Sequence, residues 1–146
     1  MQLSLAHLHL SSLPQDCVIL CGAGISPKTL GEHLGPGAGV QVYHAGVDTY
    51  DRYGAATYLP SDQKAGQEDV VRNWLDGVGG CMVTHNTLFC GMEAATAIFI
   101  SMTVDEPGLR SGLLRGVARV AFLASTGGAA PYKKEKLEEY FHVISM

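Results

Sequence analysis

The chain has 146 residues, of which 47% are hydrophobic and 16% are charged; these values are typical of one globular domain and exclude a disordered chain. The formal net charge of −4 excludes an overall positive field, so nucleic acid is expected to bind weakly at most. No apolar run reaches the roughly 18–20 residues of a membrane span, and the first residues do not have the basic region of a signal peptide. We therefore expect a soluble protein with no membrane partner, located in the cytoplasm or, as the alternative, in the nucleus.

The first elements alternate between strand and helix. Residues 18–21 form a short apolar run, which predicts a strand buried on both faces. Ser26 followed by Pro27 is typical of a helix start, because serine caps free N–H groups and proline suits the first helical position. The predicted helix covers 27–34, and the alternating residues 40–43 predict a second strand.

The middle of the chain is less regular. Residues 44–66 have no clear periodicity and contain several tyrosines, so we predict an irregular insertion with one helical turn. An apolar stripe at helical spacing then predicts a helix over 67–75. A third strand is predicted over 81–84.

The last third continues the alternation. The predicted elements are a strand over 97–101, a helix over 109–118, a strand over 120–123 and a final helix over 131–144. Strands that alternate with helices need crossover connections, which produce a parallel sheet with helices on both faces. We therefore predict one α/β domain over 1–146, with a parallel sheet in a three-layer α/β/α arrangement.

Four cysteines are present, at Cys17, Cys21, Cys81 and Cys90. Their spacing is wider than the CxxC-type pairs of zinc sites, so no metal site is predicted. Because no secretion signal is recognised, we expect free, buried thiols, with a disulfide or a zinc site as the alternatives.

The segment from 81 to 125 contains an ordered pair of motifs. In the first motif, a strand with Thr84 is followed by a loop, by a turn with Gly91 and Glu93, and by an apolar strand. In the second motif, over 113–123, Arg115 lies in a predicted helix that leads into a strand. The two motifs and their order resemble the second RecA-like domain of UvrD/Rep-type superfamily 1 helicases.

The resemblance implies a RecA-like, P-loop NTPase-like half-domain with defined site residues. It implies that Arg115 is the catalytic arginine that reaches the γ-phosphate of ATP, a role that suits a permanently charged guanidinium. It assigns nucleotide or nucleic-acid contacts to Thr84, Gly91, Glu93 and Arg119. ATP and Mg²⁺ are implied only together with a partner, which would be an N-terminal RecA-like domain or a larger parent protein.

Three positions depart from the family pattern. Cys90 replaces the lysine before the glycine of the turn, Leu114 replaces the threonine before the arginine, and Thr87 replaces the usual histidine. The half that carries the phosphate-binding loop is also missing. We therefore expect a degenerate or fragmentary relative that does not hydrolyse ATP alone and has a regulatory, nucleotide-sensing or scaffolding role.

Two other functions stay open. Gly22, Gly24, Lys28 and Thr29 follow a strand and open a helix, so they fit a degenerate phosphate loop of an autonomous nucleotide-binding domain, except that Pro27 replaces the second glycine. Alternatively, the tyrosine-rich segment 43–58 belongs to a protein-interaction module without a ligand, which would expose an apolar patch.

Overall fold

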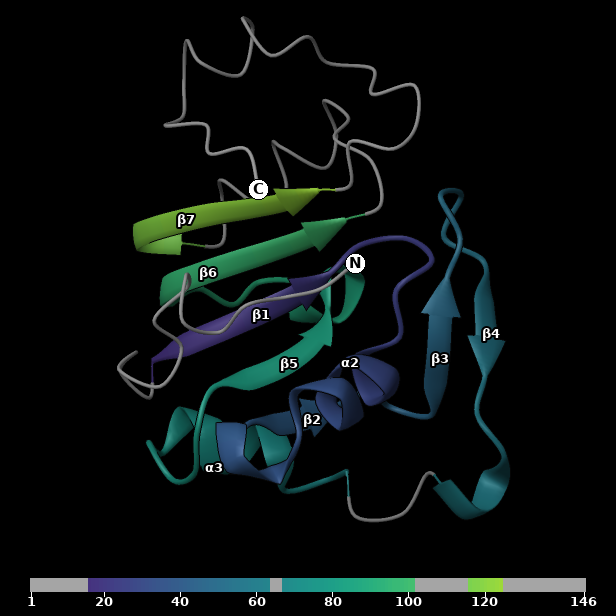
Figure 1. Cartoon of the computed structure of the whole chain (residues 1–146), viewed down its shortest axis with the longest axis horizontal. Coiled ribbons are helices and arrows are strands. Elements are labelled where there is room, and N and C mark those ends of the chain that lie inside the picture. Colours follow the sequence, from purple (N-terminus) through teal and green to yellow (C-terminus); the bar gives the residue numbers. More distant parts are fainter. Residues whose placement is uncertain (1–15, 64–66, 102–115, 125–146) are drawn as a thin grey trace, which may run out of the picture.

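A five-stranded parallel sheet is the main element of the computed structural model, which describes residues 16–63, 67–101 and 116–124 (Figure 1). Every pair of neighbouring strands in this sheet is parallel. In order across the sheet, the strands are β2 (Gln41–Tyr43), β5 (Met82–His85), β1 (Cys17–Cys21), β6 (Ala94–Ser101) and β7 (Gly116–Ala124). The predicted α/β class with a parallel sheet is confirmed.

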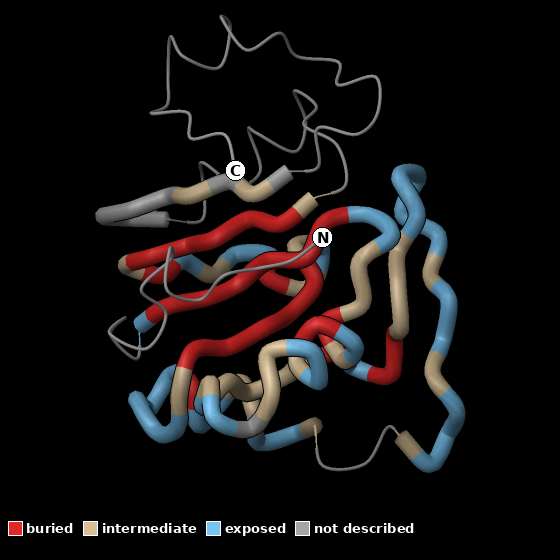
Figure 2. The backbone as a smooth tube through the Cα atoms, in the orientation of Figure 1, coloured by how far each residue is buried: buried red, intermediate tan, exposed pale blue. Residues whose placement is uncertain are grey.

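Two helices cover opposite faces of this sheet, α2 (Pro27–Leu34) and α3 (Val70–Leu75). Side chains alternate between the faces along a strand, so Ile19 of β1 packs in the cluster that contains Leu30 of α2, while Leu20 packs in the cluster of Trp74 of α3. This burial on both sides explains why β1 is apolar throughout, and Figure 2 shows β1, β5 and most of β6 as buried. Among residues 16–63, 67–101 and 116–124, no helix has the length and apolarity to cross a lipid bilayer.

The α2 helix has the predicted bounds and the predicted cap. The Ser26 hydroxyl accepts a hydrogen bond from the Thr29 N–H at 3.2 Å, and Pro27 occupies the first turn. The helix ends at Gly35, which has a φ of +79° that other residues rarely adopt. The local signals for this helix, a capping serine, a following proline and a terminal glycine, all agree.

Other predicted elements differ from the structure in their bounds. The strand predicted over 81–84 is β5, which covers 82–85, and the strand predicted over 97–101 is β6, which begins at Ala94. Helix α3 covers 70–75 and is therefore shorter than the helix predicted over 67–75. The helix predicted over 109–118 is wrong for its last three residues, because β7 already begins at Gly116 and pairs there with β6. Residues 109–115 of that helix, and the whole helix predicted over 131–144, lie outside the described residues.

The predicted insertion contains a β-hairpin. Its strands β3 (Val47–Tyr50) and β4 (Ala56–Tyr58) form a separate antiparallel pair beyond the carboxyl ends of the parallel strands (Figure 1). A 3₁₀ turn, η3 (Ser61–Gln63), follows the hairpin, and two others are η2 (Pro36–Ala38) and η4 (Asn86–Phe89). The Gly24 N–H donates to the Tyr50 carbonyl at 2.8 Å, which attaches the hairpin to the loop after β1.

Candidate functional site

The carboxyl ends of the strands form the first candidate site. Cys21 lies beside His85 and Ile100 in the register of the sheet, so these residues mark one level at this edge. Ligands of open α/β sheets bind outside this edge, which makes it the first place to look for a functional group.

The hairpin covers this edge at the end of β5. His85 is 1% exposed, its Nε2 lies 3.1 Å from the Val47 carbonyl oxygen, and its ring makes an edge-to-face contact with Tyr50 at 4.9 Å. The protein itself therefore fills the space where a ligand would meet β5. His85 and Tyr50 were not among the predicted site residues, although a histidine at the end of a buried strand was an available signal.

Thr84 lies near the end of its strand, as predicted, but it faces the core. It is 1% exposed, it lies beside Leu20 and Tyr43 in the register, and its Oγ1 has no hydrogen-bond partner among the described residues. A ligand outside the sheet does not reach this hydroxyl without a movement of the surrounding side chains.

Two buried histidines lie under the hairpin. Burial lowers the pKa of His85, and the nearby His44 lowers it further, while the Val47 carbonyl and Asp48 act in the opposite direction. Burial also lowers the pKa of His44, with a further contribution from Lys28, and Asp48 opposes it. His44 Nδ1 accepts a hydrogen bond from the Gly46 N–H at 2.9 Å, which is consistent with a neutral ring.

These lowered pKa values predict that the protein is less stable in mild acid. Below the ordinary histidine pKa of about 6.5 the unfolded chain binds protons that the folded chain does not, so the free energy of unfolding falls as pH falls. We expect this loss in urea unfolding at about pH 5.5 compared with about pH 7.5, and a smaller loss for His85→Gln. The exposed His33→Gln variant is the control, and an equal pH dependence in all three proteins would contradict the prediction.

The turn with Gly91 and Glu93 lies at the opposite, amino edge of the sheet. Thr84 is level with Phe99 through β1, and Glu93 directly precedes Ala94, the first residue of β6. Glu93 therefore lies six residues along the strand from the level of Thr84, which is about 20 Å at 3.3 Å per residue. Thr84 and Glu93, to which the resemblance assigns contacts with one ligand, do not meet at one edge, because the chain must return across the sheet before it can enter a parallel strand.

This turn is exposed but firmly anchored. Phe89 before it is fully buried and contacts Trp74 edge-to-face at 5.7 Å, and Met92 within it packs against the same cluster. Gly91 has a φ of +74°, and a Cβ there would have open space around it. Gly91 and Glu93 are both exposed, so the turn presents backbone and a carboxylate to solvent.

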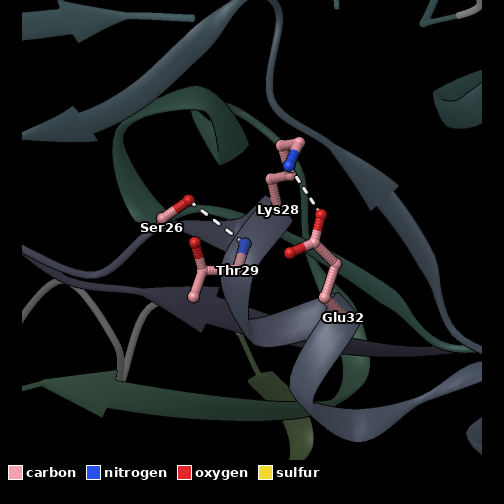
Figure 3. A network of polar contacts seen from close by, with 4 residues as sticks. All are labelled: Ser26, Lys28, Thr29 and Glu32. Atoms are coloured by element: carbon pink, nitrogen blue, oxygen red, sulfur yellow. Dashed lines mark hydrogen bonds and ion pairs between the residues drawn. The ribbon is translucent and has the colours of Figure 1, made fainter.

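The loop from Gly22 to Thr29 has few N–H groups for a phosphate. The Gly22 N–H donates to Ile100, the Gly24 N–H to Tyr50, and the Ile25 N–H to the Gly22 carbonyl. The Thr29 N–H donates to the Ser26 hydroxyl, as Figure 3 shows. A phosphate loop needs such groups to point at the ligand, so this geometry does not favour the alternative function.

Lys28 is also engaged within the helix. Its Nζ lies 2.6 Å from Glu32 Oε1, one turn further along α2 (Figure 3). A shallow depression of about 310 Å³ lies beside it, lined by Gly24, Ile25, Ser26, Thr29, Leu30 and His33. Lys28 does not line this depression, and its ammonium group pairs with Glu32 along α2.

The arginines of the second motif are placed only in part. Arg115 lies outside the described residues, and Arg119 lies in β7, where its backbone is level with Thr96 of β6. Within the ranges that the structure describes, no three histidine, cysteine, aspartate or glutamate side chains gather as metal ligands. Comparisons of the chain with protein-family models, with curated proteins and with solved structures find no match.

Proposed function

We propose that this chain is a RecA-like half-domain, similar to the C-terminal half of superfamily 1 helicases, that helps a partner domain bind nucleotide and does not turn over ATP alone. The exposed turn with Gly91 and Glu93 carries the proposal. It connects β5 to the internal strand β6, in the order that the resemblance implies, and buried Phe89 and half-buried Met92 support it. A firmly held turn at the surface is suited to contact a ligand that a second domain holds.

The chemistry of the turn favours the sugar of a nucleotide over its phosphates. The Glu93 carboxylate accepts hydrogen bonds from ribose hydroxyls, a pairing that acidic residues make in other nucleotide sites. Gly91 has no side chain, so a ligand can approach the backbone closely. Cys90 stands where a lysine would attract phosphate, so the partner domain would supply the phosphate loop and the Mg²⁺ site.

Arg115 completes this proposal as the residue that reaches the γ-phosphate in the assembled site. Phosphoryl transfer needs both such an arginine and the loop that holds Mg²⁺. The chain alone would have one of these two parts, which is the reason to expect nucleotide sensing or scaffolding rather than motor activity.

A nucleotide titration of the isolated chain tests the proposal. Hydrogen bonds to a charged group contribute about 1.5–3 kcal/mol each, whereas a dissociation constant of 1 mM corresponds to about 4.1 kcal/mol. We therefore expect no ATP hydrolysis and half-saturation with ATP·Mg²⁺ above about 1 mM. Glu93→Gln, or an ATP analogue without ribose hydroxyls, should weaken binding further.

Lys28→Ala is the matched control, because this residue carries the alternative phosphate loop. The proposal predicts that Lys28→Ala binds ATP as the unchanged chain does. Micromolar binding that Lys28→Ala abolishes, or that inorganic triphosphate competes for, would instead establish an autonomous phosphate loop and overturn the proposal.

A further inference from the structure

Two buried cysteines from neighbouring strands lie next to each other. Cys17 begins β1, and Cys81 directly precedes β5, with their sulfur atoms 3.3 Å apart. Both lie one position before the register pair Val18 and Met82, so they occupy neighbouring positions on adjacent parallel strands.

The backbone geometry at this pair permits a disulfide. Adjacent strands place neighbouring Cα atoms about 4.7–4.9 Å apart, within the roughly 4.4–6.8 Å that disulfides span. The Cys17 and Cys81 side chains already share one face, in the same core cluster. The sulfur atoms need to approach by about 1.2 Å to reach the bond length of about 2.05 Å.

No other pair of cysteines in the chain is placed in this way. Cys21 is four residues along β1 from Cys17, about 13 Å at 3.3 Å per residue, and its register partners are His85 and Ile100. Cys90 is exposed, in contrast to the prediction of four buried thiols.

The geometry points to a reversible redox site: Cys17 and Cys81 form a disulfide with hydrogen peroxide as oxidant, and this bond locks β1 to β5. The Cys17 thiolate attacks one peroxide oxygen and breaks the O–O bond, which gives a sulfenic acid and hydroxide. The Cys81 sulfur then attacks the sulfenic sulfur, the S–S bond forms, and the sulfenic oxygen leaves as hydroxide that takes the Cys81 thiol proton to become water. The hydroxide from the first step takes the proton lost earlier from Cys17 and becomes the second water molecule. A dithiol reverses the reaction by exchange.

The two thiols have complementary roles in these steps. The hydrogen bond that Cys81 donates lowers the pKa of Cys17, against the effect of burial and of Asp16. The same contact and burial raise the pKa of Cys81. Because the Cys81 thiol donates to the Cys17 sulfur at 3.3 Å, we assign the attack to the Cys17 thiolate and the resolving step to Cys81. This inference does not depend on the proposed function.

Oxidation of the folded protein by hydrogen peroxide tests the site. The protein carries the Cys90→Ser substitution, which removes the exposed thiol. We expect a mass decrease of about 2 Da, a peptide cross-link between Cys17 and Cys81, and loss of both features after dithiol treatment. A bond that closes such a long loop should also raise the melting temperature by roughly 10 °C.

Control variants separate this pair from the other thiols. Cys21→Ala should still form the bond, whereas Cys17→Ser and Cys81→Ser should each prevent it. The fluorescence of Trp74, the one tryptophan, checks that every variant is folded, since its indole donates to the Cys17 carbonyl at 2.9 Å. A bond that forms only after unfolding, or further oxidation of Cys17 to sulfinic acid in the presence of Cys81, would overturn the inference.

Discussion

Gly80→Ala is expected to destabilise the protein by roughly 3 kcal/mol or more. A Cβ at residue 80 would overlap the carbonyl oxygen of Gly39, which is backbone and cannot change rotamer. The two segments are fixed there because the Gln41 N–H donates to the Cys81 carbonyl at 2.8 Å and the Gln41 side chain donates to Gly80 at 2.9 Å. Relief of the overlap would break these bonds between β2 and β5.

Urea unfolding followed by Trp74 fluorescence measures this loss. Gly37→Ala is the matched control, because a Cβ at residue 37 meets no atom within 4 Å. We expect a change of less than about 1 kcal/mol in the control, the usual range for a glycine substitution at an unstrained position. Equal stability of the two variants would contradict the close approach of the Gly39 carbonyl oxygen to Gly80.

Phe89→Ala is expected to cost about 3–5 kcal/mol, the range for removal of a buried aromatic side chain. Phe89 is fully buried and packs edge-to-face on Trp74, so its removal leaves a cavity between η4 and α3. The same change removes the support of the turn with Gly91 and Glu93. Nucleotide binding at that turn should therefore be weaker in the variant than in the unchanged chain, when both are folded and no denaturant is present.

Leu75→Ala is the control for this prediction. Leu75 is a large apolar residue on α3, but it is 64% exposed, so its truncation should change stability by about 0.5 kcal/mol or less. A Phe89→Ala variant as stable as Leu75→Ala would contradict the packing described around η4.

Local signals in the sequence predicted β1 and α2 well. The apolar run of β1 requires burial on both faces, and the Ser26–Pro27 pair defines a helix start whatever the rest of the chain does. The hairpin was not predicted. Strands β3 and β4 are short and half-exposed, so their sequences have no strong alternation of apolar and polar residues. Their conformation depends on pairing with each other rather than on a pattern within either strand.

The candidate site was harder to predict than the fold. The residues Thr84, Gly91 and Glu93 follow each other in the order that the resemblance requires, but order along the chain does not show which edge each residue occupies. The short connection between the parallel strands β5 and β6 returns to the amino edge and carries Glu93 away from Thr84. In the same way, no local pattern indicates that Cys17 meets Cys81, since their contact arises from the pairing of β1 with β5.

Backbone amide NMR of the labelled chain during titration with ATP·Mg²⁺ tests the central claim most directly. The account predicts small, unsaturated shift changes centred on Gly91 and Glu93, which are absent for Glu93→Gln and for inorganic triphosphate. Changes centred on Gly22 to Thr29, or no change at the turn at any nucleotide concentration, would contradict it.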